Sequence, residues 1–522
     1  MSHEPVEVFD TTLRDGMQVE GVSATVDDKL RIAEQLDYLG VHFIEGGWPG
    51  ANPKDIEFFA RAATELRLDT STMVAFGSTR RPKGKVDDDA TLRNLLDANT
   101  SAVCIVAKSW DYHVLNALQT TLDEGEAMIA DSVAFLTGHG RQVLVDMEHF
   151  FDGYKRNPEF ALRALEAAVV KGASHVVLCD TNGGSLPHEV EAIVTDVQRH
   201  VGGDVIIGIH CHDDTGCAVA NSMAAVKSGA RHVQGTLNGL GERTGNCNLT
   251  TVIPNLQLKL GMPCLPEGRI ERLTAVSHHV AEVLNRPLNP QAPYVGASAF
   301  AHKAGLHVSA IARAKDAYEH VDPELVGNGT RFVVSEMAGR ATIQMKATEL
   351  GLPMDGPAVN QVIDDLKRLE HEGYHFEAAD ASLELLMRRA AGWQHDFFRV
   401  ESMRVITDEV ANGDFTTEAT VKVWIGDQRH VQTAEGNGPV NAIDSAMRAA
   451  IGGSYPLLSK VHLTDYKVRI LDGATATGAT TRVLIDATNG DRSWTTIGVS
   501  PNIIEASWRA LEESLVYGLL HV

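Results

Sequence analysis

The chain has 522 residues, of which 44% are hydrophobic and 22% charged, and its formal net charge is −23. This length predicts two or three domains, and the composition is that of an ordinary globular protein. The negative charge argues against nucleic acid or anionic membranes as partners, because both require a cationic face.

The cysteines and the N-terminal residues bear on the compartment. Six scattered cysteines do not resemble a disulfide framework and suit a reducing compartment. The first residues, MSHEPVEVFD, lack the order of basic, apolar and small residues found in signal peptides. No apolar run is long enough to cross a bilayer. We therefore expect a cytoplasmic protein with no membrane partner.

Residues 5–260 alternate short apolar runs with longer amphipathic stretches such as DDKLRIAEQLDYLG, which predict helices. The runs are VEVFD, VHFIEGGW, STMVAFG, AVCIVAK, QVLVDMEH, HVVLCDT, VIIGIHCH and HVQGTLNG. They lack strict polar alternation, as expected for parallel strands buried on both faces. Eight such units predict a TIM (β/α)8 barrel over residues 1–265. A doubly wound sheet would instead show a glycine-rich phosphate turn where this chain has TTLRDG.

Polar residues gather where the apolar runs end. They are Arg14, Asp15, Glu45, Glu148, Asp180, Thr181, His210, His212 and Asn238. In TIM barrels the carboxyl ends of the strands meet at one rim, where the chemistry takes place. We therefore expect a catalytic site at this rim.

The segment HCHDD at 210–214 gives the sharpest signal for a metal. Residues two apart on a strand point to the same face, so His210 and His212 can both face the barrel mouth. Two imidazoles and one carboxylate form a facial ligand set that leaves positions open for substrate. Asp15 on the first strand is the expected carboxylate, because the seventh, eighth and first strands are neighbours in a closed barrel. The alternative is a pair of histidines hydrogen-bonded at a strand end.

The segment NGLGERTGNCNLT at 238–250 follows the eighth run. Its glycines permit close approach of the backbone and positive φ angles. The amide oxygen of Asn246 could reach the metal. The alternative is a glycine-rich loop in which Asn246 caps a helix.

Beyond residue 265 the pattern changes. Residues 266–395 predict a helical linker region that contains the loop-rich segment PLNPQAPYVGASAFAHKAGLHVSAI. From 396 to 522 the order strand, strand, strand, helix occurs twice, and the two turns before the helices correspond. We interpret this α+β domain as a duplicated βββα unit. It has no cluster of catalytic residue types, which favours a regulatory or dimerising role.

Three segments in this order, DTTLRDG, HCHDDTG and GERTGN, resemble the alpha-isopropylmalate synthase, homocitrate synthase and citramalate synthase family. The resemblance covers nearly the whole chain, including the duplicated C-terminal domain. Within the family, EGGWPGANPKD (45–55) and DMEHFFDGYKRNP (146–158) are most similar to the citramalate synthases.

The resemblance implies a Claisen-type condensation of acetyl-CoA with a 2-oxo acid, followed by thioester hydrolysis. The oxo acid would be pyruvate and the product (R)-citramalate, a precursor in isoleucine biosynthesis. The resemblance also implies a divalent ion (Mg²⁺, Mn²⁺ or Zn²⁺) bound by Asp15, His210 and His212, with Asn246 bound or close by. The ion would act as a Lewis acid on the oxo acid.

The resemblance also assigns roles to the remaining site residues. Arg14 would stabilise the charge that develops on the ketone oxygen, or else form a structural ion pair with a rim acid. Thr181 would hydrogen-bond the carboxylate of the oxo acid, or else serve as a turn residue at a strand end. Glu148 and His307 match catalytic residues of the family, and the sequence leaves open which accepts the proton of acetyl-CoA. Tyr318 matches a family tyrosine with a one-residue shift.

One departure from the family concerns specificity. Members that bind pyruvate can place a tyrosine two residues before the glutamate, where this chain has Asp146. This departure leaves two alternatives with another oxo acid, a 2-isopropylmalate synthase and a homocitrate synthase. Two further alternatives of another class are a lyase similar to hydroxymethylglutaryl-CoA lyase and a non-catalytic amino-acid sensor. The duplicated domain argues against the lyase, and the intact rim residues argue against the sensor.

The resemblance implies feedback control by the C-terminal domain and a homodimer. The effector would be isoleucine, or leucine under the 2-isopropylmalate alternative. Two glycine-bearing turns, residues 436–439 and 498–501, are where backbone could approach a small zwitterion.

Overall fold

The computed structural model describes residues 4–201, 205–303, 310–311, 313–314, 318–335, 338–409, 414–471 and 478–521. The chain divides into two compact units, Met1–Phe300 with His320–Thr330 and Ala301–Glu319 with Arg331–Val522. Among the described residues, no helix combines the length and apolar character needed to cross a membrane. The domain boundaries expected at 265 and 395 remain predictions.

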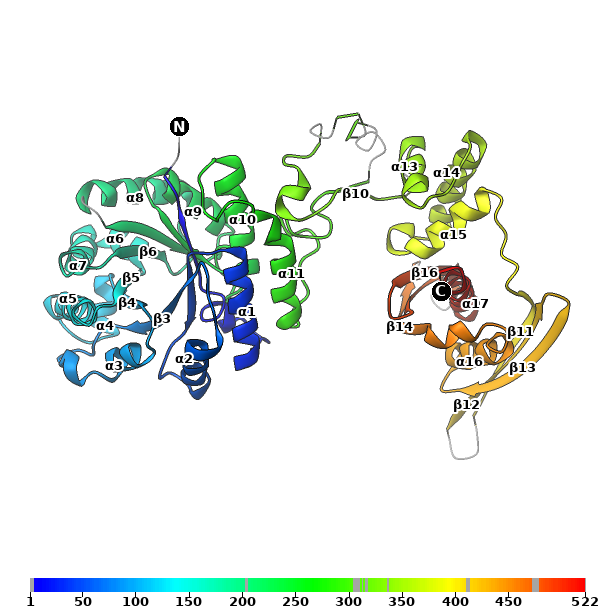
Figure 1. Ribbon diagram of the computed structural model, residues 1–522, viewed down its shortest axis with the longest axis horizontal. Helices are drawn as coiled ribbons and strands as arrows, with labels where there is room; N and C mark the ends of the chain where they lie inside the picture. Colours follow the sequence, from blue (N-terminus) through cyan, green and yellow to red (C-terminus); the bar gives the residue numbers. More distant parts are fainter. Residues whose placement is uncertain are drawn as a thin grey trace. The chain divides into compact units, whose positions relative to one another are not determined.

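The first unit contains a closed barrel whose eight parallel strands follow one another in chain order (Figure 1). Pairing of β1 with β8 closes the barrel, with Asp10 opposite Gly235. The predicted TIM barrel is confirmed. The strands are β1 (Glu7–Asp10), β2 (Phe43–Gly47), β3 (Thr72–Ser78), β4 (Ala102–Lys108), β5 (Gln142–Glu148), β6 (His175–Asp180), β7 (Ile206–Cys211) and β8 (His232–Gly235).

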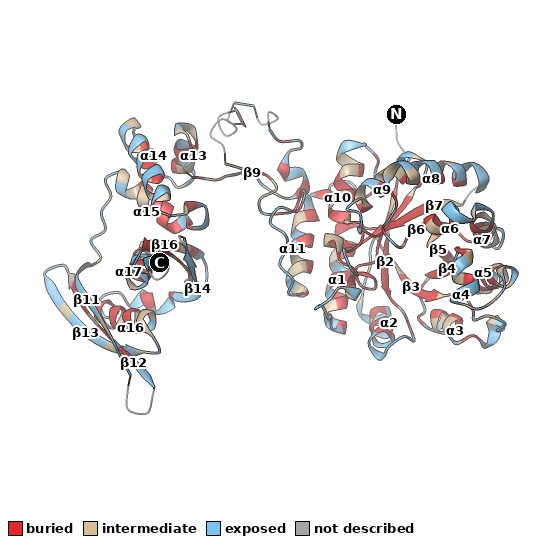
Figure 2. Cartoon of the chain, turned by 180° about the vertical axis from the view of Figure 1, so that it is seen from behind, coloured by how far each residue is buried: buried red, intermediate tan, exposed pale blue. Residues whose placement is uncertain are grey.

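Helices surround the barrel, with buried residues facing the strands and exposed residues on the outside (Figure 2). Local signals set their ends: Thr25 and Asp28 form a capping box at the start of α1, and Gly40 ends it at φ 96°. The helices of this unit are α1 (Val26–Leu39), α2 (Pro53–Glu65), α3 (Ala90–Asp97), α4 (Asp111–Asn116), α5 (Leu122–Gly138), α6 (Phe150–Arg156), α7 (Pro158–Val170), α8 (Pro187–Val201), α9 (Ala218–Lys227), α10 (Leu249–Pro254) and α11 (Leu273–Val283).

Three described helices between residues 340 and 390 precede the C-terminal sheets of the second unit. They share one buried apolar cluster that includes Ile343, Val362 and Leu383. Two residues of the third helix, Ala381 and Leu385, belong instead to the core of the C-terminal sheets. The three helices are α13 (Arg340–Glu349), α14 (Gly356–His371) and α15 (Asp380–Ala390). Two short paired strands, β9 (Ala301–His302) and β10 (Arg331–Phe332), come before them in the chain.

The C-terminal part repeats one βββα unit, as predicted. Each half forms a three-stranded antiparallel sheet followed by a helix, and both helices contribute to one apolar core. In the first sheet, alternate β12 residues from Thr417 to Val423 are buried, which matches a sheet with one covered face. The elements are β11 (Arg399–Glu409), β12 (Phe415–Ile425), β13 (Gln428–Gly436) and α16 (Pro439–Ile451), then β14 (His462–Ile470), β15 (Thr481–Thr488), β16 (Ser493–Ser500) and α17 (Ile503–His521).

Equivalent glycines of the two halves lie against helix backbone. A Cβ atom on Gly436 would lie 2.4 Å from the Ala442 nitrogen, and one on Gly498 would lie 1.9 Å from the Ala506 oxygen. A side chain at either position would collide with backbone that cannot move away. The structure thus gives both glycines a packing role, because each lets its helix approach the sheet closely.

Candidate active site

A cavity of about 250 Å³ opens at the carboxyl ends of the barrel strands. It brings together six of the predicted site residues: Arg14, Asp15, Glu148, Thr181, His210 and His212. Aromatic residues Trp48 and Phe76 form part of its wall. The sequence pattern that placed polar residues at one rim therefore identified residues that share one cavity.

The predicted metal ligands are buried and face one another. The Nε2 atoms of His210 and His212 lie 3.4 Å apart. They lie 3.6 Å and 4.0 Å from Oδ2 of Asp15, which is longer than a hydrogen bond. Adjacent ligands of an octahedral ion bound at about 2.1 Å are roughly 3 Å apart, so a small inward movement suffices to bind one. The spacing fits a divalent cation.

The charge states of these groups also suit a cation. Burial opposes ionisation of Asp15, but Arg14 and the two histidines outweigh it and lower the pKa of Asp15. Burial and the neighbouring His210 lower the pKa of His212 to about 4, so its ring is neutral at pH 7. Metal ligands must be deprotonated carboxylates and neutral imidazoles.

Asn246 completes the buried polar wall beside Asp15. Its Nδ2 donates to Oδ1 of Asp15 at 3.2 Å and to the Leu240 carbonyl at 3.1 Å. Its buried Oδ1 accepts no hydrogen bond from any described residue, which leaves an acceptor for a cation. The alternative of a helix cap does not hold, because Asn248 caps α10 by accepting from the Thr250 nitrogen.

A second cluster of possible ligands has a different geometry. Glu7, His175 and His232 are the first residues of β1, β6 and β8, at the opposite end of the barrel. The Glu7 carboxylate lies 2.7 Å from His175 and 3.2 Å from His232, and these are hydrogen-bond distances. We interpret this cluster as a hydrogen-bonded triad, in contrast to the longer spacing at the barrel mouth.

Arg14 is held in place from two sides. Its Nε donates to Oε2 of Glu45 at 2.5 Å, and its guanidinium carbon lies 3.8 Å from the centre of the Phe76 ring. A second guanidinium nitrogen lies 3.4 Å from Asp15. Although burial opposes the charge, the carboxylates of Glu45 and Asp15 outweigh it and raise the pKa of Arg14. The ion pair with a rim acid therefore exists, and it orients the cation toward the cavity.

Two further predicted residues have partners at the rim. The Glu148 carboxylate pairs with the Lys108 ammonium, and the Glu148 carbonyl accepts from the Ser109 hydroxyl at 2.8 Å. The Thr181 hydroxyl oxygen accepts from the His149 backbone nitrogen at 2.9 Å. The hydroxyl hydrogen of Thr181 can still be donated to a ligand, so its turn role and its substrate role are compatible.

The remaining predicted residues lie elsewhere. His307 is outside the described residues. Tyr318 belongs to the second compact unit and is 44% exposed. The roles of both residues remain predictions.

Sequence reasoning missed three residues of this site. Lys108 pairs with Glu148, Arg243 lines the cavity, and Gln234 contacts His210. Lys108 had a signal, because it is the one charged residue of the apolar run AVCIVAK. Arg243 lies in a segment already singled out for its glycines.

Comparisons with family models cover most of the chain. Residues 5–280 match the HMGL-like family. Residues 294–374 match the Homocitrate synthase post-HMGL domain-like family, and residues 377–519 match the LeuA allosteric (dimerisation) domain. The three matches follow one another along the sequence.

Individual relatives match over nearly their full length. The (R)-citramalate synthase of Streptomyces coelicolor is 54% identical over 98% of this chain and 96% of its own. That of Aquifex aeolicus is 50% identical, over 99% of this chain and 98% of its own. A 2-isopropylmalate synthase of Pyrococcus furiosus is 30% identical, over 98% of each chain.

Proposed function

The chain belongs to the (R)-citramalate synthase family, and we propose that it condenses acetyl-CoA with pyruvate and water to give (R)-citramalate and CoA. The full-length similarity to (R)-citramalate synthases carries this proposal. The much lower identity to a 2-isopropylmalate synthase does not favour that alternative. A lyase consisting of the barrel alone would not account for the C-terminal match to the LeuA domain.

We propose Asp15, His210 and His212 as the ligands of a divalent metal, with Asn246 close by. Their spacing, their burial and the unpartnered Asn246 oxygen support this assignment. When bound, the metal would supply Lewis acidity to the carbonyl and carboxylate oxygens of the oxo acid.

Arg14 would face the ketone oxygen of pyruvate. Negative charge grows on this oxygen as the new carbon–carbon bond forms, and a fixed guanidinium stabilises it without reorganising. Glu45 and Phe76 hold the guanidinium before the substrate arrives. The Thr181 hydroxyl would donate to the pyruvate carboxylate at the other side of the cavity.

The proton on the methyl group of acetyl-CoA needs a base close to the thioester. Glu148 lines the cavity and its carboxylate pairs with Lys108, which supports Glu148 as this base or as the group that orients the base. His307 is the other candidate for this proton. After condensation, water attacks the thioester carbonyl and CoA leaves as the thiol.

Acetyl-CoA has room beside this cavity. A second cavity of about 740 Å³ shares Arg14, Gln18 and Trp48 with the first, and Lys54 also lines it. We place the pantetheine arm there, because the thioester at its end would then reach Arg14. Six free cysteines agree with a reducing, cytoplasmic location, which remains part of the proposal.

We further propose that the C-terminal domain joins two subunits and binds isoleucine as a feedback effector. The LeuA allosteric (dimerisation) match supports both parts at the level of the domain. Isoleucine is the expected effector because citramalate leads to isoleucine.

An assay of CoA release with a panel of 2-oxo acids tests the reaction. Pyruvate should give a higher kcat/KM than 2-oxoisovalerate or 2-oxoglutarate. A preference for either of the larger acids would overturn the assignment of citramalate. CoA release that does not depend on any oxo acid would overturn the condensation itself.

A further inference from the structure

We propose that Gln234 is a positioning residue that fixes the protonated nitrogen of His210, so that the free Nε2 lone pair faces Asp15 and His212. This inference rests on the proposed role of His210 as a metal ligand. It assigns a function to a residue inside the barrel that does not line the cavity.

The three residues form one buried chain of hydrogen bonds. The Nδ1 atom of His210 lies 2.9 Å from Oε1 of Gln234. The Nε2 atom of Gln234 lies 2.9 Å from Oδ1 of Asp146. Gln234 has no exposed surface, and His210 and Asp146 are 5% and 4% exposed. Gln234 therefore has no contact with solvent, while His210 and Asp146 also line the cavity.

The strand register brings the chain together. Gln234 on β8 lies directly opposite His210 on β7 in the parallel ladder. Asp146 comes from β5, across the barrel interior. All three side chains point inward, so a change of rotamer would have to displace neighbouring side chains of a packed core.

Asp146 determines the direction of the Gln234 amide. The Cys104 sulfur and a carboxylate oxygen of Asp146 lie within 4.8 Å of each other, and burial raises the pKa of this thiol well above its ordinary value, so it stays protonated. The Gln234 NH₂ group donates to Oδ1 of Asp146, and this contact sets the direction of the amide. The Gln234 carbonyl oxygen then faces His210 and can only accept a hydrogen bond, which requires the hydrogen to be on Nδ1.

The consequence is a fixed tautomer. With the hydrogen on Nδ1, the Nε2 atom of His210 is a free lone pair directed at the proposed metal position. The reverse amide orientation would place an N–H group of His210 toward Asp15 and His212, where it would exclude a cation. Partners of this kind commonly change metal affinity by about 10–100-fold when removed.

If Gln234 had only a structural role, its replacement should affect stability and leave metal affinity unchanged. If Gln234 only filled space, a leucine of similar size would leave metal binding unchanged and alter stability alone. The test therefore compares metal affinity with stability in the substrate-free full-length protein.

The experiment measures Mn²⁺ binding by calorimetry for the wild type, Gln234→Leu, Asp146→Asn and Val233→Ala. Gln234→Leu should weaken binding by about 10-fold or more. Asp146→Asn should weaken binding by less than Gln234→Leu does, because its amide can present either an oxygen or an NH₂ group and so fixes the direction of the Gln234 amide less firmly. Val233→Ala is the matched control: it removes buried volume from the same strand and should lower the Tm without changing Mn²⁺ affinity.

A second readout reports on His210 in the metal-free protein. Nitrogen-15 NMR of histidine-labelled protein should show the Nδ1–H tautomer for His210 in the wild type and a shift toward Nε2–H in Gln234→Leu. Normal Mn²⁺ binding by Gln234→Leu with an unchanged tautomer would overturn this inference alone. No Mn²⁺ binding by the wild type would overturn the proposed ligand set together with it.

Discussion

The Nε atom of Arg14 lies 2.5 Å from Oε2 of Glu45, while the guanidinium stacks on the Phe76 ring. The acid sets the direction of the guanidinium and the ring sets its plane. Both partners belong to the barrel, so the cation is positioned before substrate binds. Preorganised charge of this kind lowers the barrier of a reaction in which charge develops.

Replacing Arg14 with alanine should lower kcat by roughly 10²-fold or more, because the charge that it meets grows in the transition state. Steady-state CoA release with pyruvate measures this. The KM for pyruvate should change much less than kcat. If only KM rose, Arg14 would be a binding group for the ground state.

Replacing Glu45 with glutamine should have a milder effect of the same kind. The amide still accepts from Arg14 but no longer fixes it by charge, so we expect kcat to fall by about 10-fold. A double variant with Arg14→Ala should be no slower than Arg14→Ala alone, because Glu45 acts through the guanidinium. Additive losses would show that Glu45 has a separate role.

Removing divalent metal with a chelator should abolish CoA release, and Mg²⁺ or Mn²⁺ should restore it. His212→Ala should weaken Mn²⁺ binding, because it removes one protein ligand from a small set. Glu7→Gln is the control, since its cluster has hydrogen-bond spacing and should not hold the catalytic ion. Full activity in a verified metal-free sample would contradict the proposed metal dependence.

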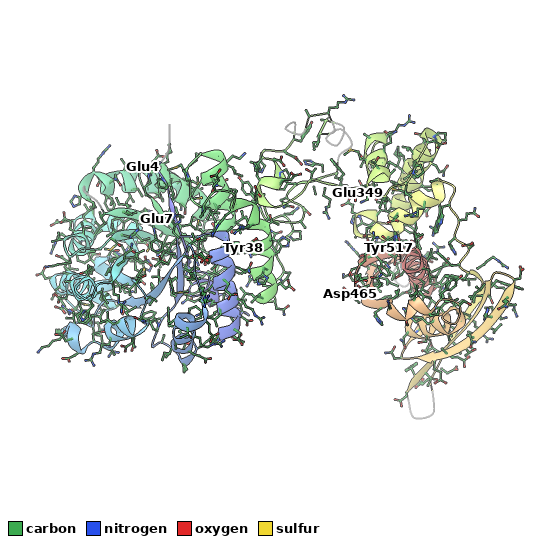
Figure 3. The ribbon with its side chains drawn as sticks, in the orientation of Figure 1. Glu4, Glu7, Tyr38, Glu349, Asp465 and Tyr517 are labelled. Atoms are coloured by element: carbon green, nitrogen blue, oxygen red, sulfur yellow. The ribbon has the colours of Figure 1, made fainter. Side chains whose placement is uncertain are left out.

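The triad at the start of the barrel strands should make the fold sensitive to acid (Figure 3 labels Glu7). Burial opposes ionisation of Glu7, but the hydrogen bonds from His175 and His232 outweigh it and lower its pKa below 4.5. The ionised carboxylate thus stabilises the fold above pH 4.5, and this contribution is lost as pH falls. Burial also lowers the pKa of His232 from 6.5 to about 4, so protonation of this ring opposes folding as pH falls from 6.5 to about 4.

Both shifts act in the same direction but in different pH ranges. The His232 shift should lower the free energy of unfolding by on the order of 2 kcal/mol between pH 7 and pH 4, and the Glu7 shift should lower it further below pH 4.5. Urea unfolding of the full-length protein, carried out at a series of pH values from 7 to below 4.5, measures this free energy. Glu7→Gln should be less stable at pH 7, and it should lose less stability than the wild type as pH falls below 4.5, where the Glu7 carboxylate of the wild type takes up its proton. An equal pH dependence in both proteins would assign the acid sensitivity to other groups.

Isoleucine should inhibit the full-length enzyme, and leucine should be weaker. A ligand shifts an equilibrium only by its differential affinity, so isoleucine must bind a less active state more tightly. Calorimetric titration with each amino acid, beside the CoA assay, tests this. If neither amino acid binds, the domain is left with a purely dimerising role.

The structure changes how a truncation should be designed. A chain that ends near residue 395 keeps α15 but removes the sheets whose core contains Ala381 and Leu385. Those apolar side chains would become exposed and favour aggregation. A loss of inhibition in such a chain would therefore not isolate the effector site.

The sequence predicted the fold well, because the evidence for it is local. Each barrel strand is a continuous apolar run, and each half of the C-terminal repeat has its own alternation and turns. The rim residues were also predictable, since parallel strands bring their carboxyl ends together.

The partners of the rim residues were less accessible to sequence reasoning. Gln234 meets Asp146 across the barrel interior, 88 positions away in the chain, and only closure of the barrel creates that contact. Lys108 and Glu148 likewise pair across neighbouring strands. The packing role of Gly498 was also hidden, because it depends on how closely α17 approaches β16.

The separation of the two polar clusters along the same strands has a practical consequence for engineering. Glu7, His175 and His232 sit where the strands begin, and the proposed catalytic groups sit where they end. Directed evolution for acid tolerance or heat resistance could therefore randomise the floor of the barrel while the reaction centre is left untouched. Libraries confined to those three positions would select for a more stable enzyme, and we expect them to leave kcat largely unchanged.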